Sequence, residues 1–175
     1  MNFILKCKIS MTKCHLIKKD KSMKTVSNSI ITMTELVLPQ HTNQLGNLLG
    51  GQLMHWIDIS AALSSSKHAG RICVTASVDR IDFHHPIKLG DVVTIVSSVN
   101  RVFNSSMEVG VSVCAENYSK GIKRHTNSAY LTFVGLDSDG NPVKSESITP
   151  ESKGEKRRYD EALDRRERRL SLRKK

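Results

Sequence analysis

The sequence NQLGNLLGGQLMHWID occupies residues 43–58 and joins a glycine-rich turn to an apolar segment. Gly46, Gly50 and Gly51 permit tight backbone geometry and close approach to a ligand. Apolar residues then recur at roughly helical spacing as far as about His68, which predicts a helix with one buried face. These apolar residues are Leu53, Trp56, Ile57, Ala61 and Leu63. We therefore expect a helix that starts at the paired glycines and packs against a core.

Asp58 is the residue that fits this helix least well. It follows Ile57 directly, about two turns after the paired glycines. A carboxylate is costly to bury there unless it is paired or used chemically. It can act as a general base or as a nucleophile. The alternative is a structural carboxylate held by a partner, and the spacing leaves both interpretations open.

The start of the helix is a second candidate for chemistry. Gly50, Gly51 and Gln52 contribute backbone N–H groups that have no partner within the first turn of a helix. Such groups favour negative charge, including the charge that develops on a polarised carbonyl oxygen. Asn47 in the turn can donate and accept hydrogen bonds. The alternative is that these residues form only a turn.

The positive charge of this 175-residue chain, +10 in total, lies at its two ends. Residues 1–24 carry seven basic residues against one acidic residue, and residues 153–175 carry eleven against five. The segment between them has nine basic and eleven acidic residues. A nucleic-acid-binding domain is expected to carry its positive patch on the folded part. We therefore expect no nucleic-acid partner, although basic ends can still meet polyanions.

The four cysteines and the apolar runs indicate the cellular compartment of the protein. Cys7, Cys14, Cys73 and Cys114 contain no C-x-x-C pair, so we expect free thiols rather than a disulfide framework or a zinc site. No apolar run approaches the roughly 18 residues that a membrane span needs. The apolar run at the start of the chain is too short for the apolar region of a signal peptide. We expect a cytoplasmic protein without a membrane partner.

The segments outside the helix read mainly as strands, and the chain length suggests one domain. Residues 30–38 are β-branched and apolar and end at Pro39. Gly70 is a plausible stop for the helix. Four further strand-like runs follow at 72–83, 92–102, 107–116 and 129–136. Because no helix separates these strands, they should pair antiparallel, which predicts an α+β fold with one central helix on a sheet.

The two ends differ in composition from the domain between them, which we place at 25–145. Residues 1–24 are rich in lysine and are expected to be disordered, and Met23 is a possible alternative translation start. Residues 146–175 form a charged tail with good helix formers. We expect a mostly solvated helix there. The alternative is a helix that packs over a neighbouring element or reaches an anionic ligand.

Several other motifs are weaker. His84 and His85 follow Asp82, but adjacent strand residues point to opposite faces, so we expect no metal site. Ser64 to Ser66 lack the G-x-S-x-G turn of a serine nucleophile. The glycine turn matches neither dinucleotide nor triphosphate motifs. Lys123 and Arg124 form a small cationic cluster that suits phosphate, or else a charged strand edge.

The blocks of sequence considered together resemble hotdog-fold acyl-CoA thioesterases, in the branch of bacterial YciA-like enzymes and cytosolic acyl-CoA hydrolases. The similarity extends from about Thr34 to Val143 and consists of separate blocks in the same order. These blocks are residues 36–51, 56–58, 74–80, 82–83, 86–91, 105–109 and 128–133.

The resemblance implies an acyl-CoA hydrolase with a long helix wrapped by a curved antiparallel sheet. It implies an obligate homodimer, often a trimer of dimers (a homohexamer), and no cofactor beyond the coenzyme A of the substrate. The family pairs an asparagine in the turn with a helix aspartate, which places Asn47 of one subunit opposite Asp58 of the other. Relatives commonly have Glu after this aspartate, whereas this chain has Ile59.

The remaining site residues are assigned from their own chemistry. Gly50, Gly51 and Gln52 are expected to stabilise the oxyanion of the thioester. Asn104, Ser105 and Ser106 are typical of a hairpin turn and could also line a polar chain such as pantetheine, and Lys123 and Arg124 suit the phosphates of CoA. A non-catalytic acyl-CoA-binding module and a hotdog hydratase or dehydratase are the competing classes. The hydratase class needs a His-containing block that this sequence lacks.

Overall fold

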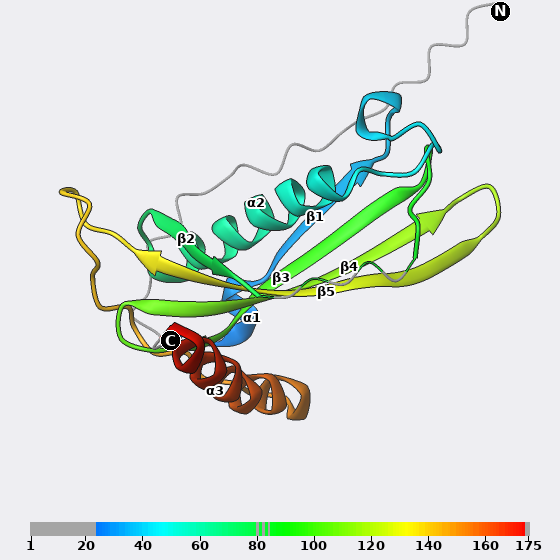
Figure 1. The fold of residues 1–175 in the computed structure, drawn as a ribbon. Helices are drawn as coiled ribbons and strands as arrows, with labels where there is room; N and C mark the ends of the chain where they lie inside the picture. The colour runs from blue at the N-terminus through cyan, green and yellow to red at the C-terminus, as the bar shows by residue number, and fades with distance from the viewer. Residues whose placement is uncertain (1–23, 80, 82, 84, 174–175) are drawn as a thin grey trace, which may run out of the picture.

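The structure is a computed structural model that describes residues 24–79, 81, 83 and 85–173. The expectations for residues 1–23, including the disordered extension and the start at Met23, lie outside these ranges, as do Asp82 and His84. The elements follow one another in the order shown in Figure 1. They are α1 (Val26–Ser29), β1 (Ile31–Leu36), the 3-10 helix η1 (Pro39–His41), α2 (Gly50–Ala69), β2 (Cys73–Val78), β3 (Val92–Val102), β4 (Ser106–Asn117), β5 (Ile122–Gly135) and α3 (Lys153–Arg173).

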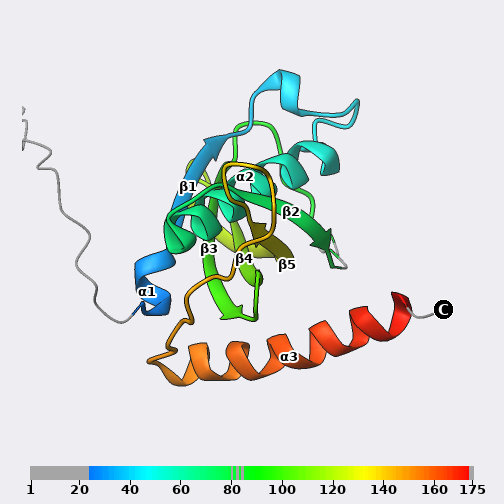
Figure 2. The ribbon, with the colours of Figure 1, turned by 90° about the vertical axis from the view of Figure 1, so that its left-hand side faces the viewer.

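The strands form one antiparallel sheet in the order β1-β3-β4-β5-β2. The sheet curves around α2, while α3 lies on its opposite, outer face (Figure 2). Strands joined by hairpins pair antiparallel because the chain reverses at each turn. The predicted α+β arrangement of one long helix against an antiparallel sheet is confirmed.

The core lies between α2 and the inner face of the sheet. Successive residues of a strand point to opposite faces, so every second residue of β4 enters this core. These residues, all buried, are Met107, Val109, Val111, Val113 and Ala115. The buried α2 side chains include Leu53, Trp56, Ile57 and Ala61, as the helical spacing predicts. Removing such apolar surface from water holds α2 on the sheet.

Both ends of α2 agree with the sequence signals. The helix begins at Gly50 after Leu49, which provides no side-chain cap for the first turn. It ends before Gly70, whose backbone is left-handed with φ of 69°. The N–H of Gly70 donates to the carbonyl oxygen of Ser66 at 2.8 Å, which closes the last turn.

Two strand boundaries differ from the prediction. β5 begins at Ile122 rather than near Ala129, so Lys123 and Arg124 lie within the strand. The hairpin with β4 continues past these charged residues, because backbone pairing does not depend on side chains that face solvent. β2 ends at Val78 rather than at Phe83, after an irregularity between Thr75 and Ser77.

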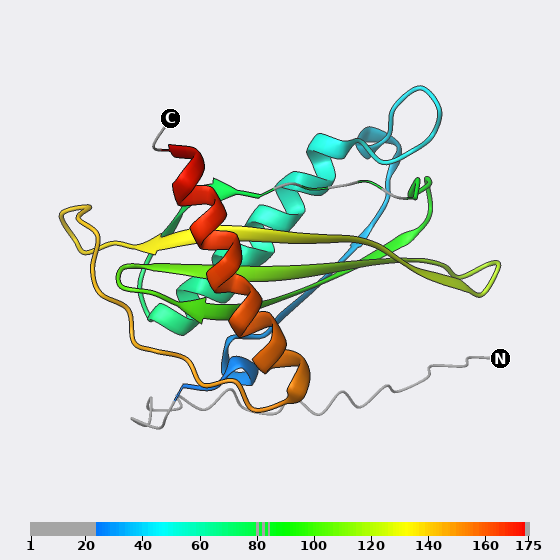
Figure 3. The same ribbon diagram turned by 60° about the horizontal axis from the view of Figure 1, so that its bottom comes forward.

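The C-terminal helix does more than extend into solvent. α3 crosses the outer face of the sheet (Figure 3) and contacts β3. Arg165 makes two hydrogen bonds to Glu108 of β4, at 3.0 and 2.8 Å. Arg169 pairs with Asp79 at 3.1 Å. The expectation of a mostly solvated helix was therefore incomplete, because these ion pairs, the buried Ala162 and the Tyr159 side chain, which packs against the core, attach this face of α3 to the domain.

Candidate active site

The first turn of α2 presents backbone donors without a side-chain cap. Leu53 is the first residue whose N–H bonds within the helix, to the carbonyl of Leu49 at 3.1 Å. The N–H groups at the preceding positions are therefore available for a ligand. A Cβ on Gly51 would meet nothing within 4 Å, whereas one on Gly50 would lie 3.4 Å from the ring of Phe83. The ring of Phe83 therefore lies within van der Waals reach of the start of α2.

Asn43 organises the turn before this helix. Its side-chain oxygen accepts hydrogen bonds from the N–H groups of Leu45 at 2.9 Å and Asn47 at 3.2 Å. Its own N–H donates to the carbonyl of Asn47 at 2.8 Å. Gly46 has φ of 69°, which favours glycine. The sequence interpretation gave no role to Asn43, although an asparagine that begins a glycine-containing turn is a recognised signal.

Asn47 lies at the end of this turn, half-buried, and is joined to Lys88 by a backbone bridge. The adjacent N–H of Leu48 donates to the carbonyl of Ile87 at 2.7 Å. The turn is thus attached to the segment that precedes β3. This attachment holds the Asn47 side chain at the edge of a cavity.

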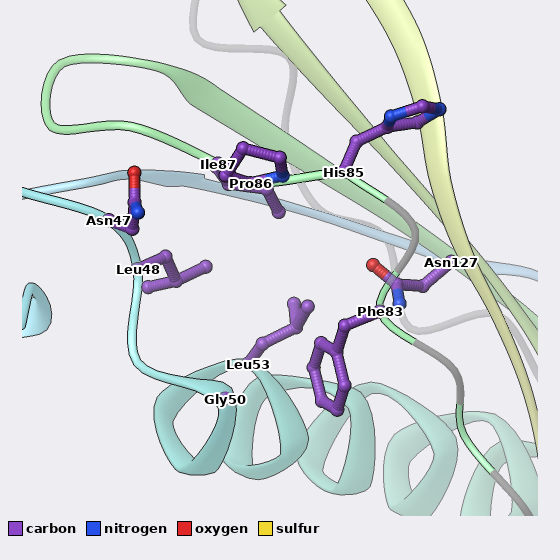
Figure 4. A pocket seen from close by; sticks show the side chains of 9 residues that line it. All are labelled: Asn47, Leu48, Gly50, Leu53, Phe83, His85, Pro86, Ile87 and Asn127. Carbon is purple, nitrogen blue, oxygen red and sulfur yellow. The ribbon is translucent and has the colours of Figure 1, made fainter. Parts of the chain in front are cut away.

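The cavity has a volume of about 380 Å³ and lies between the start of α2 and the segment before β3 (Figure 4). Three amide or imidazole side chains, Asn47, His85 and Asn127, interrupt a largely apolar lining. The full lining is Asn47, Leu48, Gly50, Leu53, Phe83, His85, Pro86, Ile87 and Asn127. An apolar cavity with a few polar groups is typical of small-molecule sites.

Asp58 lies farther along α2 and is half-buried. Its Oδ1 accepts a 2.7 Å hydrogen bond from the hydroxyl of Thr75 on β2. This bond fixes the orientation of the carboxylate. The sequence interpretation missed Thr75, because a threonine in a strand carries no motif and the two residues are 17 positions apart.

Asp58 and Asn47 do not meet within one chain. Asp58 is absent from the lining of the cavity that contains Asn47. The predicted oxyanion residues Gly50, Gly51 and Gln52 lie in the first turn of α2, close in sequence to Asn47. Within one chain, the predicted site is therefore divided between the first turn of α2 with Asn47 and the later position of Asp58.

The residues predicted to contact CoA occupy two distant places. Asn104, Ser105 and Ser106 lie at the β3–β4 hairpin, where the N–H of Ser145 donates to the Asn104 carbonyl at 3.0 Å. Lys123 lies near the other end of β4 and pairs with Glu116 at 3.7 Å. The 12 residues of β4 separate the two groups by roughly 37 Å at ~3.4 Å per residue. Their role in CoA binding stays a prediction.

The described residues also bear on metal binding and membrane insertion. Across residues 24–79, 81, 83 and 85–173, no group of three or more His, Cys, Asp or Glu side chains is placed to hold a metal ion. No helix in these ranges is long and apolar enough to pass through a membrane. Cys73 and Cys114 are free cysteines, and burial raises the pKa of the Cys73 thiol.

Comparison with known proteins places the chain in a family. The family model of the thioesterase superfamily matches residues 45–121. A Bacillus subtilis protein, named an uncharacterised acyl-CoA thioester hydrolase, is 40% identical over 137 residues, which are 78% of this chain and 80% of that protein. The chain belongs to the thioesterase superfamily. The antiparallel sheet curved around one long helix is accordingly the hotdog fold that the sequence predicts.

Longer members of the family contain a similar segment. Mouse acyl-coenzyme A thioesterase 11 is 45% identical over 140 residues, 80% of this chain, but the match spans only 23% of that protein. The rat cytosolic acyl coenzyme A thioester hydrolase is 34% identical over 143 residues, which are 81% of this chain and 38% of that protein.

Solved structures of the thioesterase superfamily match nearly the whole described chain. An acyl-CoA hydrolase from Staphylococcus aureus, in complex with butyryl coenzyme A, coenzyme A and coenzyme A disulfide, is 41% identical with a TM-score of 0.81. The match covers 87% of this chain and 93% of that one. A hexameric acyl-CoA thioesterase is 37% identical with a TM-score of 0.83, over 86% and 96% of the two chains.

The S. aureus hydrolase has also been solved as three alanine variants. They replace an aspartate, an asparagine 15 residues before it and a threonine 17 residues after it. In the present chain, Thr75 follows Asp58 by the same 17 residues. The residue 15 positions before Asp58 is Asn43.

Proposed function

We propose that this chain hydrolyses the thioester bond of fatty acyl-CoA to give free CoA and a carboxylic acid. The observation that carries the proposal is the hydrogen bond from Thr75 to Asp58, because it orients a carboxylate on the same helix whose first turn has uncapped amides. The related S. aureus enzyme, an acyl-CoA hydrolase by name, supports the choice of substrate. Its spacing of aspartate and threonine matches that of Asp58 and Thr75.

The proposed reaction uses these groups in two ways. The thioester carbonyl lies over the start of α2, where the amides near Gly51 stabilise the negative charge that develops on its oxygen. Asp58 either removes a proton from the attacking water or attacks the carbonyl itself to give an anhydride that water then opens. In both routes the C–S bond breaks, and the thiolate of CoA leaves and takes up a proton. Neither route requires a cofactor.

Two asparagines are candidates for orienting the carbonyl. Asn47, the predicted residue, contributes to the cavity beside the start of α2. Asn43 has the spacing from Asp58 that the S. aureus asparagine has, and its side-chain oxygen anchors the turn. The amide nitrogen of either residue can donate to a carbonyl oxygen. Replacing each by alanine separately tests which one contributes to kcat.

The proposed active site is completed by a second copy of the chain. β2 pairs with β5 on one side only, so among the described strands its other edge has no partner. A strand edge of this kind can pair with the same edge of another copy about a two-fold axis. Exposed apolar side chains lie on β2, namely Val74 and Val78, and on the face of α2 that carries Asp58, namely Met54. Pairing of two β2 strands would bring Asp58 of each copy toward the turn of the other.

The same proposal covers the assembly, the binding of CoA and the location. The hexameric relative supports a trimer of such dimers. Asn104, Ser105 and Ser106 of one chain and Lys123 and Arg124 of another are proposed to share the CoA moiety, since they lie far apart within one chain. The cytosolic relative supports a cytoplasmic enzyme.

A thiol-release assay with acyl chains from short to long tests the activity. The wild-type protein should release CoA, and Asp58→Asn should lower kcat by orders of magnitude while CoA still binds. Binding of CoA without thiol release by the wild-type protein would indicate the non-catalytic class instead. Hydration of an enoyl-CoA without thiol release would indicate the hydratase class.

A mixing experiment tests whether the site is shared. The Asp58→Asn protein and the asparagine variant that proves inactive are unfolded together and refolded as a mixture. If each site combines two chains, random mixing restores about a quarter of the wild-type sites, because one site in four receives both intact residues. If one chain supplies both residues, the mixture stays inactive. Each variant refolded alone is the control.

A further inference from the structure

A second cavity lies on the outer face of the sheet, beside α3, and has a volume of about 320 Å³. It is lined by Val96, Ser98, Asn100, Gly110, Val111, Ser112, Ser128, Tyr130, Arg157 and Arg158. The strands and α3 both contribute to it, whereas α2 and Asp58 do not. The sheet lies between α2 and α3 (Figure 2). It therefore separates this outer pocket, which α3 helps to line, from Asp58 on α2.

Asn100 supplies a buried acceptor to the outer pocket. Its side chain is 2% exposed, and its Nδ2 donates to Oε1 of Glu108 at 3.0 Å. Because Glu108 only accepts, this bond fixes which end of the amide is the oxygen. The Oδ1 atom of Asn100 has no hydrogen-bond partner among the described residues. A buried acceptor without a hydrogen bond costs free energy of folding, so a hydrogen bond from a ligand donor would lower that cost.

The amide of Asn100 occupies the space that a side chain at Gly110 would need. A Cβ at Gly110 would lie 2.6 Å from Nδ2 and 2.9 Å from Oδ1 of Asn100. The amide of Asn100 is bonded to Glu108. Glu108 cannot move with it to relieve the contact, because Arg165 holds both of its carboxylate oxygens. The position of the Asn100 amide therefore depends on the absence of a side chain at residue 110.

The rest of the lining favours an anion. Arg157 and Arg158 supply two guanidinium groups. Ser98, Ser112 and Ser128 supply hydroxyl groups, of which the last two also bond the ring of His125, at 3.4 and 3.1 Å. None of the lining residues is acidic. Arg157 also pairs with Glu161 at 2.6 Å, but its side chain is 64% exposed, so the group can turn toward a ligand. Arginine and hydroxyl donors together are well suited to phosphate oxygens.

We propose that the outer pocket binds a small phosphorylated ligand of the nucleotide class. The phosphate lies against Arg157 and Arg158, and an amino or hydroxyl group of the ligand donates to Oδ1 of Asn100. The volume falls within the range of about 300–1,000 Å³ that small-molecule sites occupy. Because the outer pocket lies across the sheet from Asp58, this ligand is distinct from the acyl-CoA that is hydrolysed.

Isothermal titration of the full chain with ADP, adenosine and inorganic phosphate tests the proposal. We expect saturable ADP binding at one site per chain, and weaker binding of adenosine and of phosphate, which each satisfy half of the pocket. The double variant Arg157→Ala/Arg158→Ala should weaken ADP binding at least about tenfold, because it removes charge-assisted hydrogen bonds. Ser128→Leu, which fills the pocket without changing charge, should weaken it similarly.

Lys153→Ala/Lys156→Ala is the matched control, since it removes two positive charges from the same helix outside the lining. Equal loss of ADP affinity in both double variants would mean general charge attraction and would overturn the proposal. No saturable binding by the folded wild-type protein would also overturn it. A parallel rise in KM for acyl-CoA in the arginine variant would assign the pocket to the substrate instead. None of these results alters the test of thioester hydrolysis.

Discussion

The hydroxyl of Thr75 donates a 2.7 Å hydrogen bond to Oδ1 of Asp58, and this bond connects β2 to α2. It links a half-buried carboxylate in the middle of a helix to an edge strand most of whose residues are exposed. A carboxylate oriented in this way can keep one oxygen directed at a reacting water while the other is held. The relationship makes Thr75 a positioning residue in the proposed reaction.

Thr75→Val should therefore lower kcat by about tenfold or more, because a hydrogen bond to a charged group contributes ~1.5–3 kcal/mol. Thr75→Ser, which keeps the hydroxyl, should retain most of the activity. Thiol-release kinetics with a saturating acyl-CoA measure both. Wild-type kcat in the valine variant would mean that the bond is only structural, and unfolding curves of both variants control for stability.

The ion pair between Arg165 and Glu108 attaches α3 to the sheet. Glu108 is 1% exposed and the Arg165 side chain 17%. Burial alone would lower the pKa of Arg165, but the hydrogen bonds and charge of Glu108 leave that pKa raised, so the guanidinium stays charged. The guanidinium also lies 3.8 Å from the centre of the Tyr130 ring.

Arg165→Met should destabilise the protein by about 3 kcal/mol, because it leaves a buried carboxylate without its partner. Urea unfolding measures the change, and Arg168→Met, at an exposed position of the same helix, is the control. The double variant Glu108→Leu/Arg165→Met should recover much of the loss. A single variant as stable as the control would show that the ion pair does not hold α3.

The first turn of α3 gives a prediction about pH. Ser152 and Glu155 form a capping box, in which Oε2 of Glu155 accepts from the N–H groups of Glu151 at 2.7 Å and Ser152 at 3.0 Å. The N–H of Glu155 donates to the Ser152 hydroxyl at 3.2 Å. The backbone bond from Ser152 is the main reason that the pKa of Glu155 is lowered from its ordinary value of 4.5.

Because the pKa of Glu155 is lower in the folded state than in the unfolded state, its ionised carboxylate stabilises α3 above pH 4.5. This stabilisation is lost as the pH falls through the lowered pKa of the folded state. Helicity of α3, followed by circular dichroism, should therefore decrease on acidification below pH 4.5. Glu155→Gln should remove that part of the pH dependence. Ser152→Ala should cost about 1 kcal/mol at neutral pH. An unchanged acid transition in the glutamine variant would contradict the assignment.

Gly110→Ala is expected to destabilise the sheet. The new Cβ would come within 2.6 Å of Nδ2 of Asn100, which its bond to Glu108 prevents from moving. Overpacking of this kind costs about 1–3 kcal/mol. In an Asn100→Ala background the clash is gone, so the same substitution should be nearly neutral. Equal costs in the two backgrounds, measured by thermal unfolding, would rule out the clash as the cause.

Local signals were sufficient to predict α2 and most of the sheet. The paired glycines before an apolar helical run and Gly70 after it mark the ends of α2, because backbone conformations at helix ends depend on neighbouring residues. The alternating residues of β3 and β4 predict strands with one buried face. The charged start of β5 was missed, since its pairing with β4 outweighs the composition of the segment.

The contacts between side chains distant in the sequence could be read only from the folded structure. Thr75 lies beside Asp58, and Arg165 beside Glu108, because the sheet and the helices bring residues 17 and 57 positions apart into contact. The amino-acid sequence alone was sufficient for the conformations that depend on neighbouring residues, namely the ends of α2 and the strands with one buried face. Tertiary packing selected the partners of Asp58 and Glu108, since a carboxylate entering a core takes whichever donor the neighbouring element places there.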